Sequence, residues 1–205
     1  MMEVSDKAAA ILMASGFSRR FGGRNKLLIP FNGKPLASYT LELATAMDFN
    51  GGIFFICARD DVAALALEPT VIRNTAPELK VIKNTAPEKG LCESVRLGVE
   101  AAGDADYFLF FPCDMPFLDT NTVHGILDAR KNGRIVEPRC QGRPGNPCLF
   151  SATFREELLS LKEGETPRLI KERHPDAVIG FEVSNPLIFE DIDDEKTLKR
   201  LCERS

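Results

Sequence analysis

The chain has 205 residues, of which 44% are hydrophobic and 27% are charged, and its formal net charge is −4. These values are typical of a folded globular protein and exclude a largely disordered or collagen-like chain. The negative charge argues against a nucleic-acid partner, and no apolar run approaches the roughly 18 residues needed to span a bilayer, which argues against a membrane partner.

The first half of the chain predicts strands that alternate with helices. The opening sequence, MMEVSDKAAAILMAS, lacks the basic start and the long apolar core of a secretory signal, so we expect a cytoplasmic protein. Its apolar part, residues 7–15, predicts a buried parallel strand. Further strands are predicted at residues 53–57, 71–72, 81–82 and 107–111, and helices at residues 35–47, 60–67 and 88–102.

The second half continues the alternation. Helices are predicted at residues 121–130, 152–161, 167–172 and 194–202, and short strands at residues 134–138, 148–150, 178–182 and 187–189. Strands alternating with helices indicate an α/β fold with a mainly parallel sheet and helices on both faces, which makes three layers. No linker rich in Ser, Gly or Pro divides the chain, so we expect a single domain over residues 1–205.

A loop rich in glycine and arginine, residues 15–26, follows the first strand. The surrounding segment from Lys7 to Leu41 contains six basic residues and no acidic one. The loop is not a P-loop, and the chain has no G-x-G-x-x-G, which argues against a dehydrogenase or flavodoxin-like domain. Glycines let backbone N–H groups approach phosphate oxygens, and basic side chains neutralise them. The residues alone leave two interpretations: a phosphate- or nucleotide-binding loop, or a solvated basic surface loop.

Two acidic sites are candidates for binding a metal. Asp114 follows the strand at 107–111 and lies between two prolines in FFPCDMPFL. Its carboxylate would suit Mg²⁺, although capping the following turn is the alternative. Asp191 and Asp193 alternate along an expected strand end in IFEDIDDEKTL, so their side chains would point the same way, whereas Asp194 is expected to cap the last helix.

Cysteine and histidine are unpromising as catalysts in this sequence. The six cysteines are scattered without a C-x-x-C pair, which predicts reduced structural thiols. Cys113 adjoins Asp114 but has no evident base, so we expect a buried, inert thiol. The two histidines cannot form a His-rich metal centre.

The loop sequence LMASGFSRRFGGRNKLLIPFNGKPL, residues 12–36, resembles the signature of the MobA-like nucleotidyltransferases, L-A-A-G-x-S-x-R-x-G-x-x-K-x-L-x-x-x-x-G-x-P-L. The segment around Asp114 resembles the family's G/C-D-x-P-x-L motif, and Asp191-Ile192-Asp193 resembles the first half of its D-I-D-T-P-E-D motif. NTAPEKGLCESVRL and QGRPGNPCLF resemble two further family segments, with Asn146 where histidine is usual. The resemblance implies a Rossmann-like nucleotidyltransferase fold.

The resemblance also implies roles for individual residues. Nucleotide binding falls on Met13, Ala14, Ser15, Gly16, Lys26, Asn84, Gly90 and Ser94. Catalysis falls on Arg20 and Lys26, which would face the phosphates, together with Asp114. Magnesium binding falls on Asp114 with Asp191 or Asp193.

The function implied is Mg²⁺-dependent transfer of a nucleotide to the terminal phosphate of molybdopterin, with release of pyrophosphate. The Ala-Ser-Gly turn followed by K-L-L resembles the cytidylyltransferase branch, which favours CTP. The alternatives are a guanylyltransferase using GTP, a sugar- or polyol-phosphate nucleotidyltransferase, and a non-catalytic module that binds a nucleotide or cofactor. A molybdoenzyme or its chaperone is a possible protein partner.

Overall fold

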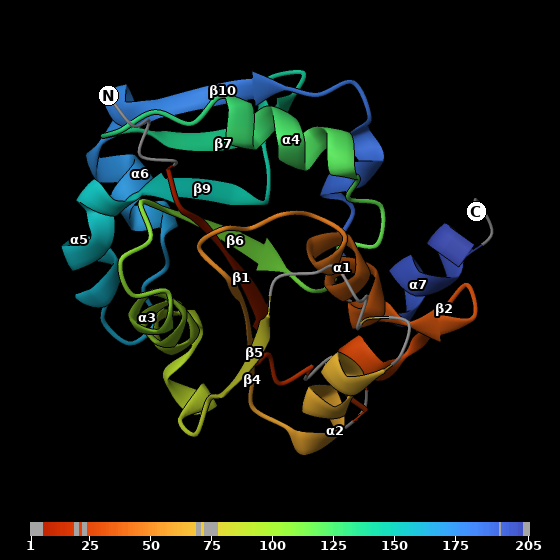
Figure 1. The fold of residues 1–205 in the computed structure, drawn as a ribbon. Helices are drawn as coiled ribbons and strands as arrows, with labels where there is room; N and C mark the ends of the chain where they lie inside the picture. Colours follow the sequence, from red (N-terminus) through yellow and green to blue (C-terminus); the bar gives the residue numbers. More distant parts are fainter. Residues whose placement is uncertain are drawn as a thin grey trace.

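The computed structural model describes residues 6–18, 21, 24–68, 71, 78–192 and 194–202, and within them the chain forms an eight-stranded sheet and a small hairpin (Figure 1). The sheet strands are β1 (Ala8–Ala14), β4 (Ile53–Cys57), β5 (Leu79–Lys83), β6 (Tyr107–Pro112), β7 (Ile135–Cys140), β8 (Arg143–Pro144), β9 (Cys148–Ser151) and β10 (Val178–Glu182). The hairpin strands are β2 (Pro30–Phe31) and β3 (Lys34–Pro35).

Seven α-helices lie in the described part of the chain. They are α1 (Leu36–Thr45), α2 (Asp60–Ala63), α3 (Leu91–Ala101), α4 (Thr120–Asp128), α5 (Arg155–Leu159), α6 (Arg168–Arg173) and α7 (Glu195–Cys202). Short 3-10 helices occupy Lys26–Leu28, Ala64–Leu67, Pro87–Lys89, Ala152–Phe154, Pro175–Ala177 and Pro186–Phe189. None of the helices in these described ranges combines the length and the apolar character that crossing a membrane requires.

The strand order of the sheet is β10-β7-β9-β6-β1-β4-β5, with β8 paired to β7. Strands β6, β1, β4 and β5 are parallel to one another. Strand β9 runs antiparallel to both of its neighbours, β6 and β7, and β10 is parallel to β7. The mainly parallel α/β sheet predicted from the sequence is therefore confirmed, with β9 as an antiparallel insertion in its middle.

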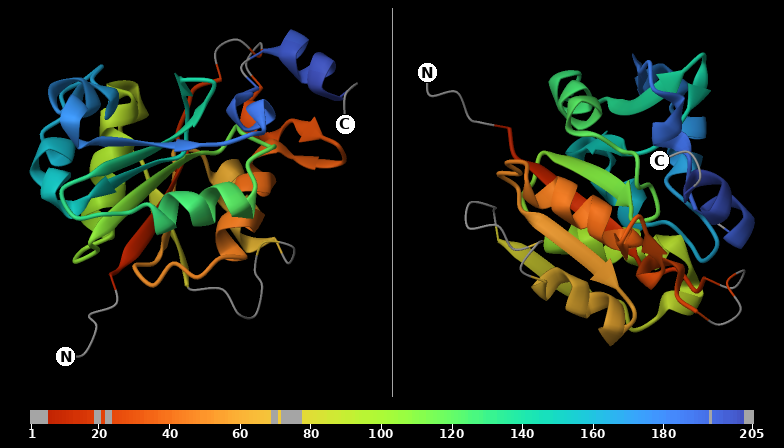
Figure 2. Two further views of the ribbon diagram at one scale, coloured as in Figure 1. Left: turned by 90° about the horizontal axis from the view of Figure 1, so that it is seen from above. Right: turned by 90° about the vertical axis from the view of Figure 1, so that its right-hand side faces the viewer.

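Helices cover both faces of the sheet and make three layers (Figures 1 and 2). Successive side chains of β1 alternate between the two faces. Ala10 and Leu12 join the core that contains residues of α1, α2 and α4, whereas Ala9 and Ile11 join the core beneath α3, α5 and α6. Burial on both faces explains why this strand reads as an unbroken apolar run.

Helix α3 packs unusually close to β1 at Gly98. A Cβ atom added there would lie 2.3 Å from Cγ2 of Ile11, which is itself fully buried. We expect Gly98→Ala to lower the free energy of unfolding by about 1–2 kcal/mol, because overpacking costs about 1–3 kcal/mol and alanine's helix propensity returns at most ~1 kcal/mol. Urea denaturation measures the change. In an Ile11→Ala background the substitution should cost nothing, and stabilisation by Gly98→Ala alone would contradict the packing.

The structure corrects three expected elements. Residues 187–189 are not a strand: Pro186 starts a 3-10 helix, and the Asn185 side chain accepts a hydrogen bond from the Leu187 N–H at 3.0 Å. The helix expected from residue 88 begins only at Leu91, because Gly90 has a φ of +88°. The expected strand at 71–72 is a turn at Val71, and residue 72 lies outside the described residues.

The C-terminal segment packs against the hairpin β2–β3, and Figure 2 shows α7 beside it. A separate apolar cluster joins Phe21 and Phe31 to Ile192 and Leu201. Asp194 caps α7, because its carboxylate accepts a hydrogen bond from the Thr197 N–H at 2.7 Å. This packing brings the segment around Ile192, which is distant in sequence, to the edge of the sheet where β1 and β6 end.

Candidate active site

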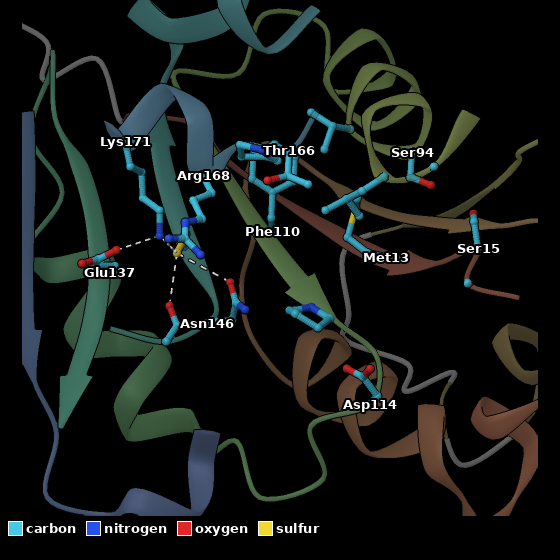
Figure 3. Close-up of a pocket in the computed structure, with 18 of the residues that line it drawn as sticks. Met13, Ser15, Ser94, Phe110, Asp114, Glu137, Asn146, Thr166, Arg168 and Lys171 are labelled. Atoms are coloured by element: carbon cyan, nitrogen blue, oxygen red, sulfur yellow. Dashed lines mark hydrogen bonds and ion pairs between the residues drawn. The ribbon is translucent and has the colours of Figure 1, made fainter. Parts of the chain in front are cut away.

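A cavity of about 950 Å³ opens at the carboxyl ends of β1 and β6 (Figure 3). This is the edge where open α/β sheets bind their ligands. Residues at or after the ends of β1 and β6 line one side, and β7 and α6 line the other. The polar residues of the lining are Ser15, Ser18, Lys26, Ser94, Asp114, Glu137, Arg139, Asn146, Thr166, Arg168, Lys171 and Glu172.

The end of β1 and the turn that follows it carry the residues predicted to hold a nucleotide. Met13, Ser15 and Gly16 line the cavity, whereas the Ala14 side chain is buried in the core. The Ser15 hydroxyl donates a hydrogen bond to the Ile56 carbonyl at 3.2 Å and so ties the turn to β4. Of this set, Ala14 can contribute only its backbone to the cavity.

Hydrogen bonds within the loop fix the position of Lys26. Its backbone N–H donates to the Ser18 hydroxyl at 2.9 Å, and Ser18 has a positive φ of 51°. The Asn25 carboxamide oxygen accepts a hydrogen bond from the Leu27 N–H at 3.0 Å and caps the 3-10 helix that begins at Lys26. The lysine therefore starts a short rigid element at the cavity wall. Arg20, predicted to be its partner on the phosphates, lies outside the described residues.

Lys26 and Asp114 meet across the cavity floor. Lys26 Nζ lies 2.6 Å from Asp114 Oδ2, and the two side chains are only 15% and 17% exposed. The other carboxylate oxygen, Oδ1, is buried and accepts no hydrogen bond from the described residues. A buried carboxylate oxygen without a donor is costly unless a cation or a ligand compensates it.

Asp114 also anchors the C-terminal acidic segment. The Ile192 N–H donates a hydrogen bond to the Asp114 carbonyl at 3.1 Å. Asp191 directly precedes this contact, but its side chain is exposed and is not among the residues that line the cavity. Asp193 lies outside the described residues, and the strand end that was to align it with Asp191 is absent from 186–192, where a 3-10 helix leads into irregular backbone.

These donors fit a hard divalent cation such as Mg²⁺. The Oδ1 atom of Asp114 is the open oxygen, and Asp191 is the nearest carboxylate on the segment that the Ile192 N–H ties to Asp114. The described residues contain no group of three His, Cys, Asp or Glu side chains able to hold a metal by themselves. A cation at Asp114 would therefore complete its shell with water and phosphate oxygens, as Mg²⁺ usually does.

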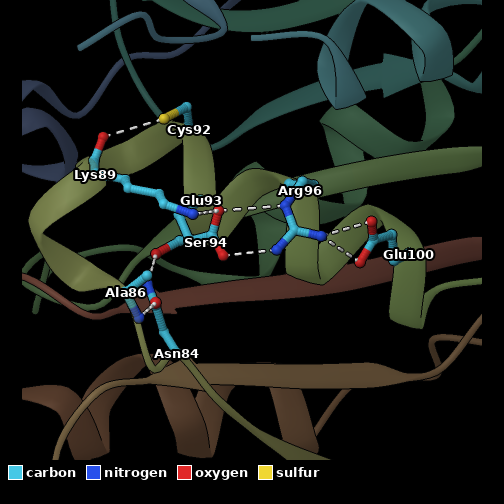
Figure 4. Close-up of polar contacts among 8 residues, drawn as sticks. All are labelled: Asn84, Ala86, Lys89, Cys92, Glu93, Ser94, Arg96 and Glu100. Atoms are coloured by element: carbon cyan, nitrogen blue, oxygen red, sulfur yellow. Dashed lines mark hydrogen bonds and ion pairs between the residues drawn. The ribbon is translucent and has the colours of Figure 1, made fainter. Parts of the chain in front are cut away.

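The start of α3 lines the cavity on the side of β1 and β6, and we call this part of the lining the roof. Gly90 and Ser94 line it, whereas Asn84, which is only 1% exposed, does not. The Asn84 side chain instead donates a hydrogen bond to Ser94 Oγ at 3.1 Å and accepts one from the Ala86 N–H (Figure 4). Asn84 thus orients Ser94 and the turn before α3. Glu93 is held by Arg96 at 2.6 Å, a hydrogen bond that lowers the pKa of the Glu93 carboxyl.

The opposite side of the cavity holds a cluster that sequence reasoning did not find, the distal wall (Glu137, Arg139, Asn146, Cys148 and Lys171). Glu137 Oε2 accepts a hydrogen bond from Lys171 Nζ at 2.7 Å, and its Oε1 accepts one from Arg139 at 3.0 Å. Lys171 Nζ also lies 3.6 Å from Cys148 Sγ. Of these five residues, only Asn146 could be connected with the site from the sequence, through the glycine- and proline-rich segment QGRPGNPCLF.

The cysteines near the cavity are protonated at neutral pH. Burial raises the pKa of Cys148 to about 11, against the opposing effect of the Lys171 ammonium. Burial, reinforced by the Asp114 carboxylate, likewise raises the pKa of Cys113 well above its ordinary value. Because the thiolate is the reactive form, neither residue is suited to act as a nucleophile.

Comparison with known proteins gives a consistent result. Residues 10–178 match the family described as "MobA-like NTP transferase domain". A molybdenum cofactor guanylyltransferase of Ralstonia pickettii (strain 12J) is 25% identical over 217 residues, covering 100% of both chains. A 2-C-methyl-D-erythritol 4-phosphate cytidylyltransferase of Dehalococcoides mccartyi is 27% identical over 137 residues, covering 63% of this chain and 56% of that protein.

Solved structures share the fold at low sequence identity. A nucleotidyl transferase from Methanothermobacter superposes with a TM-score of 0.77 at 19% identity, covering 97% of both chains. The protein Rv0371C of Mycobacterium tuberculosis H37Rv, solved as a complex with manganese, gives a TM-score of 0.72 at 21% identity and covers 97% of this chain and 100% of that one. These likenesses establish the architecture that places the cavity.

Proposed function

The chain belongs to the MobA-like NTP transferase domain family and is a nucleotidyltransferase, and from that premise we propose that it transfers GMP from GTP to the terminal phosphate of a molybdenum cofactor. The full-length match to a molybdenum cofactor guanylyltransferase supports the acceptor and the base. The observation that carries the chemistry is the buried Lys26–Asp114 pair, whose Oδ1 atom is left open in a cavity large enough for two substrates.

The reaction joins an acceptor phosphate oxygen to the α-phosphorus of the nucleotide and breaks the bond to pyrophosphate. A phosphate nucleophile is already ionised at neutral pH, so no general base is needed. The task of the protein is positioning and charge stabilisation. The turn at Ser15 and Gly16 and the roof at Ser94 would hold the nucleoside. Lys26 would offset negative charge on the triphosphate and on the departing pyrophosphate.

Asp114, with Asp191 or Asp193, would hold a divalent cation, for which we propose Mg²⁺. When bound, the cation would neutralise phosphate charge and favour departure of pyrophosphate. In the structure, Lys26 pairs with Asp114 directly. On nucleotide binding the ammonium of Lys26 can turn from the carboxylate to the phosphates while remaining close to both.

CTP is the second candidate nucleotide. The Ala-Ser-Gly turn at Ala14–Gly16, followed by K-L-L, favours it, and a cytidylyltransferase is among the relatives over part of the chain. The several relatives named molybdenum cofactor guanylyltransferase, two of them matched over the full length, outweigh this feature. We therefore reverse the preference for CTP drawn from the turn alone.

Titration calorimetry of the purified protein with GTP, CTP, ATP and UTP tests the nucleotide. We expect GTP with Mg²⁺ to bind at least about tenfold more tightly than the other three, a difference of about 1.4 kcal/mol, and the binding to weaken when Mg²⁺ is removed with a chelator. Selective binding of CTP would assign the protein to the cytidylyltransferase branch. Binding of all four with equal affinity would contradict a base-selective turn.

A further inference from the structure

The distal wall carries an excess positive charge inside the cavity. Among the described lining residues, four are basic (Lys26, Arg139, Arg168 and Lys171) and three are acidic (Asp114, Glu137 and Glu172). Lys26 pairs with Asp114, and Arg168 pairs with Glu172 at 2.8 Å. Arg139 and Lys171 are left to share the single carboxylate of Glu137.

The geometry of the wall keeps this charge in place. The Glu137 side chain is only 5% exposed and the Lys171 side chain 21%. Gly180 on β10 makes room for Arg139, because a Cβ there would lie 2.6 Å from Arg139 Cδ. Cys148 adds no charge, since its pKa is about 11. Burial acts to lower the pKa of Lys171, whereas its hydrogen bond and ion pair with the Glu137 carboxylate act to raise it, so that carboxylate holds the ammonium in place.

A partly buried cation without a full counter-charge is unfavourable until an anion reaches it. We propose that the distal wall binds a second anionic group of the acceptor substrate, separate from the phosphate that reacts at Asp114, and that Lys171 is its main contact. The acceptor is then a molecule with anionic groups at two points, one at each side of the cavity (Figure 3). The inference rests on the proposed function only for the identity of that acceptor.

A charge series on Lys171 and Glu137 separates this role from a structural one. The wild-type wall has a net charge of +1. Lys171→Met makes it neutral, Glu137→Gln with Lys171→Met restores +1 through Arg139, and Glu137→Gln alone makes it +2. Anion binding should follow these charges, whereas a merely structural pair predicts that Glu137→Gln alone, which also breaks the pair, weakens anion binding as Lys171→Met does.

The first arm measures steady-state transfer to molybdenum cofactor at saturating nucleotide. Losing a hydrogen bond to a charged group should raise the acceptor KM of Lys171→Met about ten- to a hundredfold. The nucleotide Kd should change less than about twofold, and the double variant should recover part of the acceptor KM. Lys80→Met, an exposed lysine on β5 outside the cavity, is the matched control. An unchanged acceptor KM in Lys171→Met would overturn the proposal.

The second arm assumes no particular acceptor. Sulfate is titrated by calorimetry into protein saturated with Mg²⁺ and nucleotide, so that the Lys26 side is filled. Sulfate should bind the wild type, the double variant and Lys171→Arg, and should bind Lys171→Met at least about tenfold more weakly. If the wild type transfers nothing to molybdenum cofactor but sulfate follows the charge series, the proposed function fails and the anion subsite stands. If transfer occurs but sulfate ignores the series, the subsite fails.

Folding of each variant is checked by thermal unfolding. Should Lys171→Met unfold, Glu137→Gln alone remains decisive, because its charge of +2 must tighten sulfate binding relative to the wild type. Equal or weaker binding by that folded variant would overturn the proposal.

Discussion

Asp114→Asn should lower kcat about a thousandfold, which corresponds to about 4 kcal/mol of lost transition-state stabilisation. The substitution keeps the size and shape of the side chain but replaces the carboxylate, with its open Oδ1 atom, by a neutral amide. A neutral amide is a poor ligand for Mg²⁺ and a poor counter-charge for Lys26. The nucleotide Kd should rise much less, by under about tenfold, because the turn after β1 and the roof at α3 are unchanged.

Rates of pyrophosphate release and calorimetric nucleotide affinities, measured on the same protein, check this prediction. Asp48→Asn is the matched control, since Asp48 is exposed and does not line the cavity. A kcat within threefold of the wild type for Asp114→Asn would show that the carboxylate takes no part in the chemistry. Equal losses of nucleotide binding and turnover would reduce its role to binding alone.

Lys26→Met should lower kcat/KM for the nucleotide about a hundred- to a thousandfold, or about 3–4 kcal/mol. The variant keeps the length of the side chain and removes the cation that, in the proposed function, would face the triphosphate. It also leaves the mostly buried Asp114 carboxylate without its partner, which should cost about 1–3 kcal/mol of stability. Initial rates at varied nucleotide concentration and urea denaturation measure the two effects.

Lys34→Met is the matched control for Lys26→Met. It removes a lysine from the same basic segment, but that lysine pairs with Glu42 and does not line the cavity, so the kcat/KM of this variant should stay near the wild-type value.

A double variant tests whether Lys26 and Asp114 act as a pair. Lys26→Met/Asp114→Asn should be destabilised by less than the sum of the single variants, because it leaves no unpaired charge. Additive stability losses would mean that the 2.6 Å pair contributes no coupling.

The sheet could be anticipated because its central strands carry a strong local signal. Strand β4 coincides with the predicted range 53–57, and β1 lies within the predicted range 7–15. Both are buried on two faces, so each reads as a continuous apolar run. The hairpin β2–β3 was missed although Asn32-Gly33 at its turn is a recognised signal, with positive φ at both residues.

The wrong prediction of a strand at residues 187–189 has a different physical cause. Leu187, Ile188 and Phe189 form an apolar run that predicts a strand, yet Pro186 and the Asn185 cap favour a 3-10 helix. Ile188 and Phe189 are buried in a small cluster with Cys140 rather than in the sheet. Short apolar runs do not distinguish these outcomes, since burial and not periodicity produces them.

The two sides of the cavity differ in how far sequence could predict them. Lys26 and Asp114 each follow a predicted strand at the sheet edge, so their meeting could be expected from topology. Glu137 and Lys171 are 34 residues apart and meet only because α6 packs on the face of the sheet beside β7. Asn84 was expected to bind the nucleotide. Its side chain is buried and donates a hydrogen bond to Ser94, which lines the cavity.

The most direct test of the proposed activity is to incubate the protein with α-labelled GTP, Mg²⁺ and molybdenum cofactor, and to measure pyrophosphate and the mass of the product. We predict one pyrophosphate released for each acceptor that gains a GMP unit through a new phosphoanhydride bond, with transfer from CTP at least about tenfold slower. Nucleotide binding without pyrophosphate release, in protein shown to be folded and supplied with molybdenum cofactor, would contradict the account.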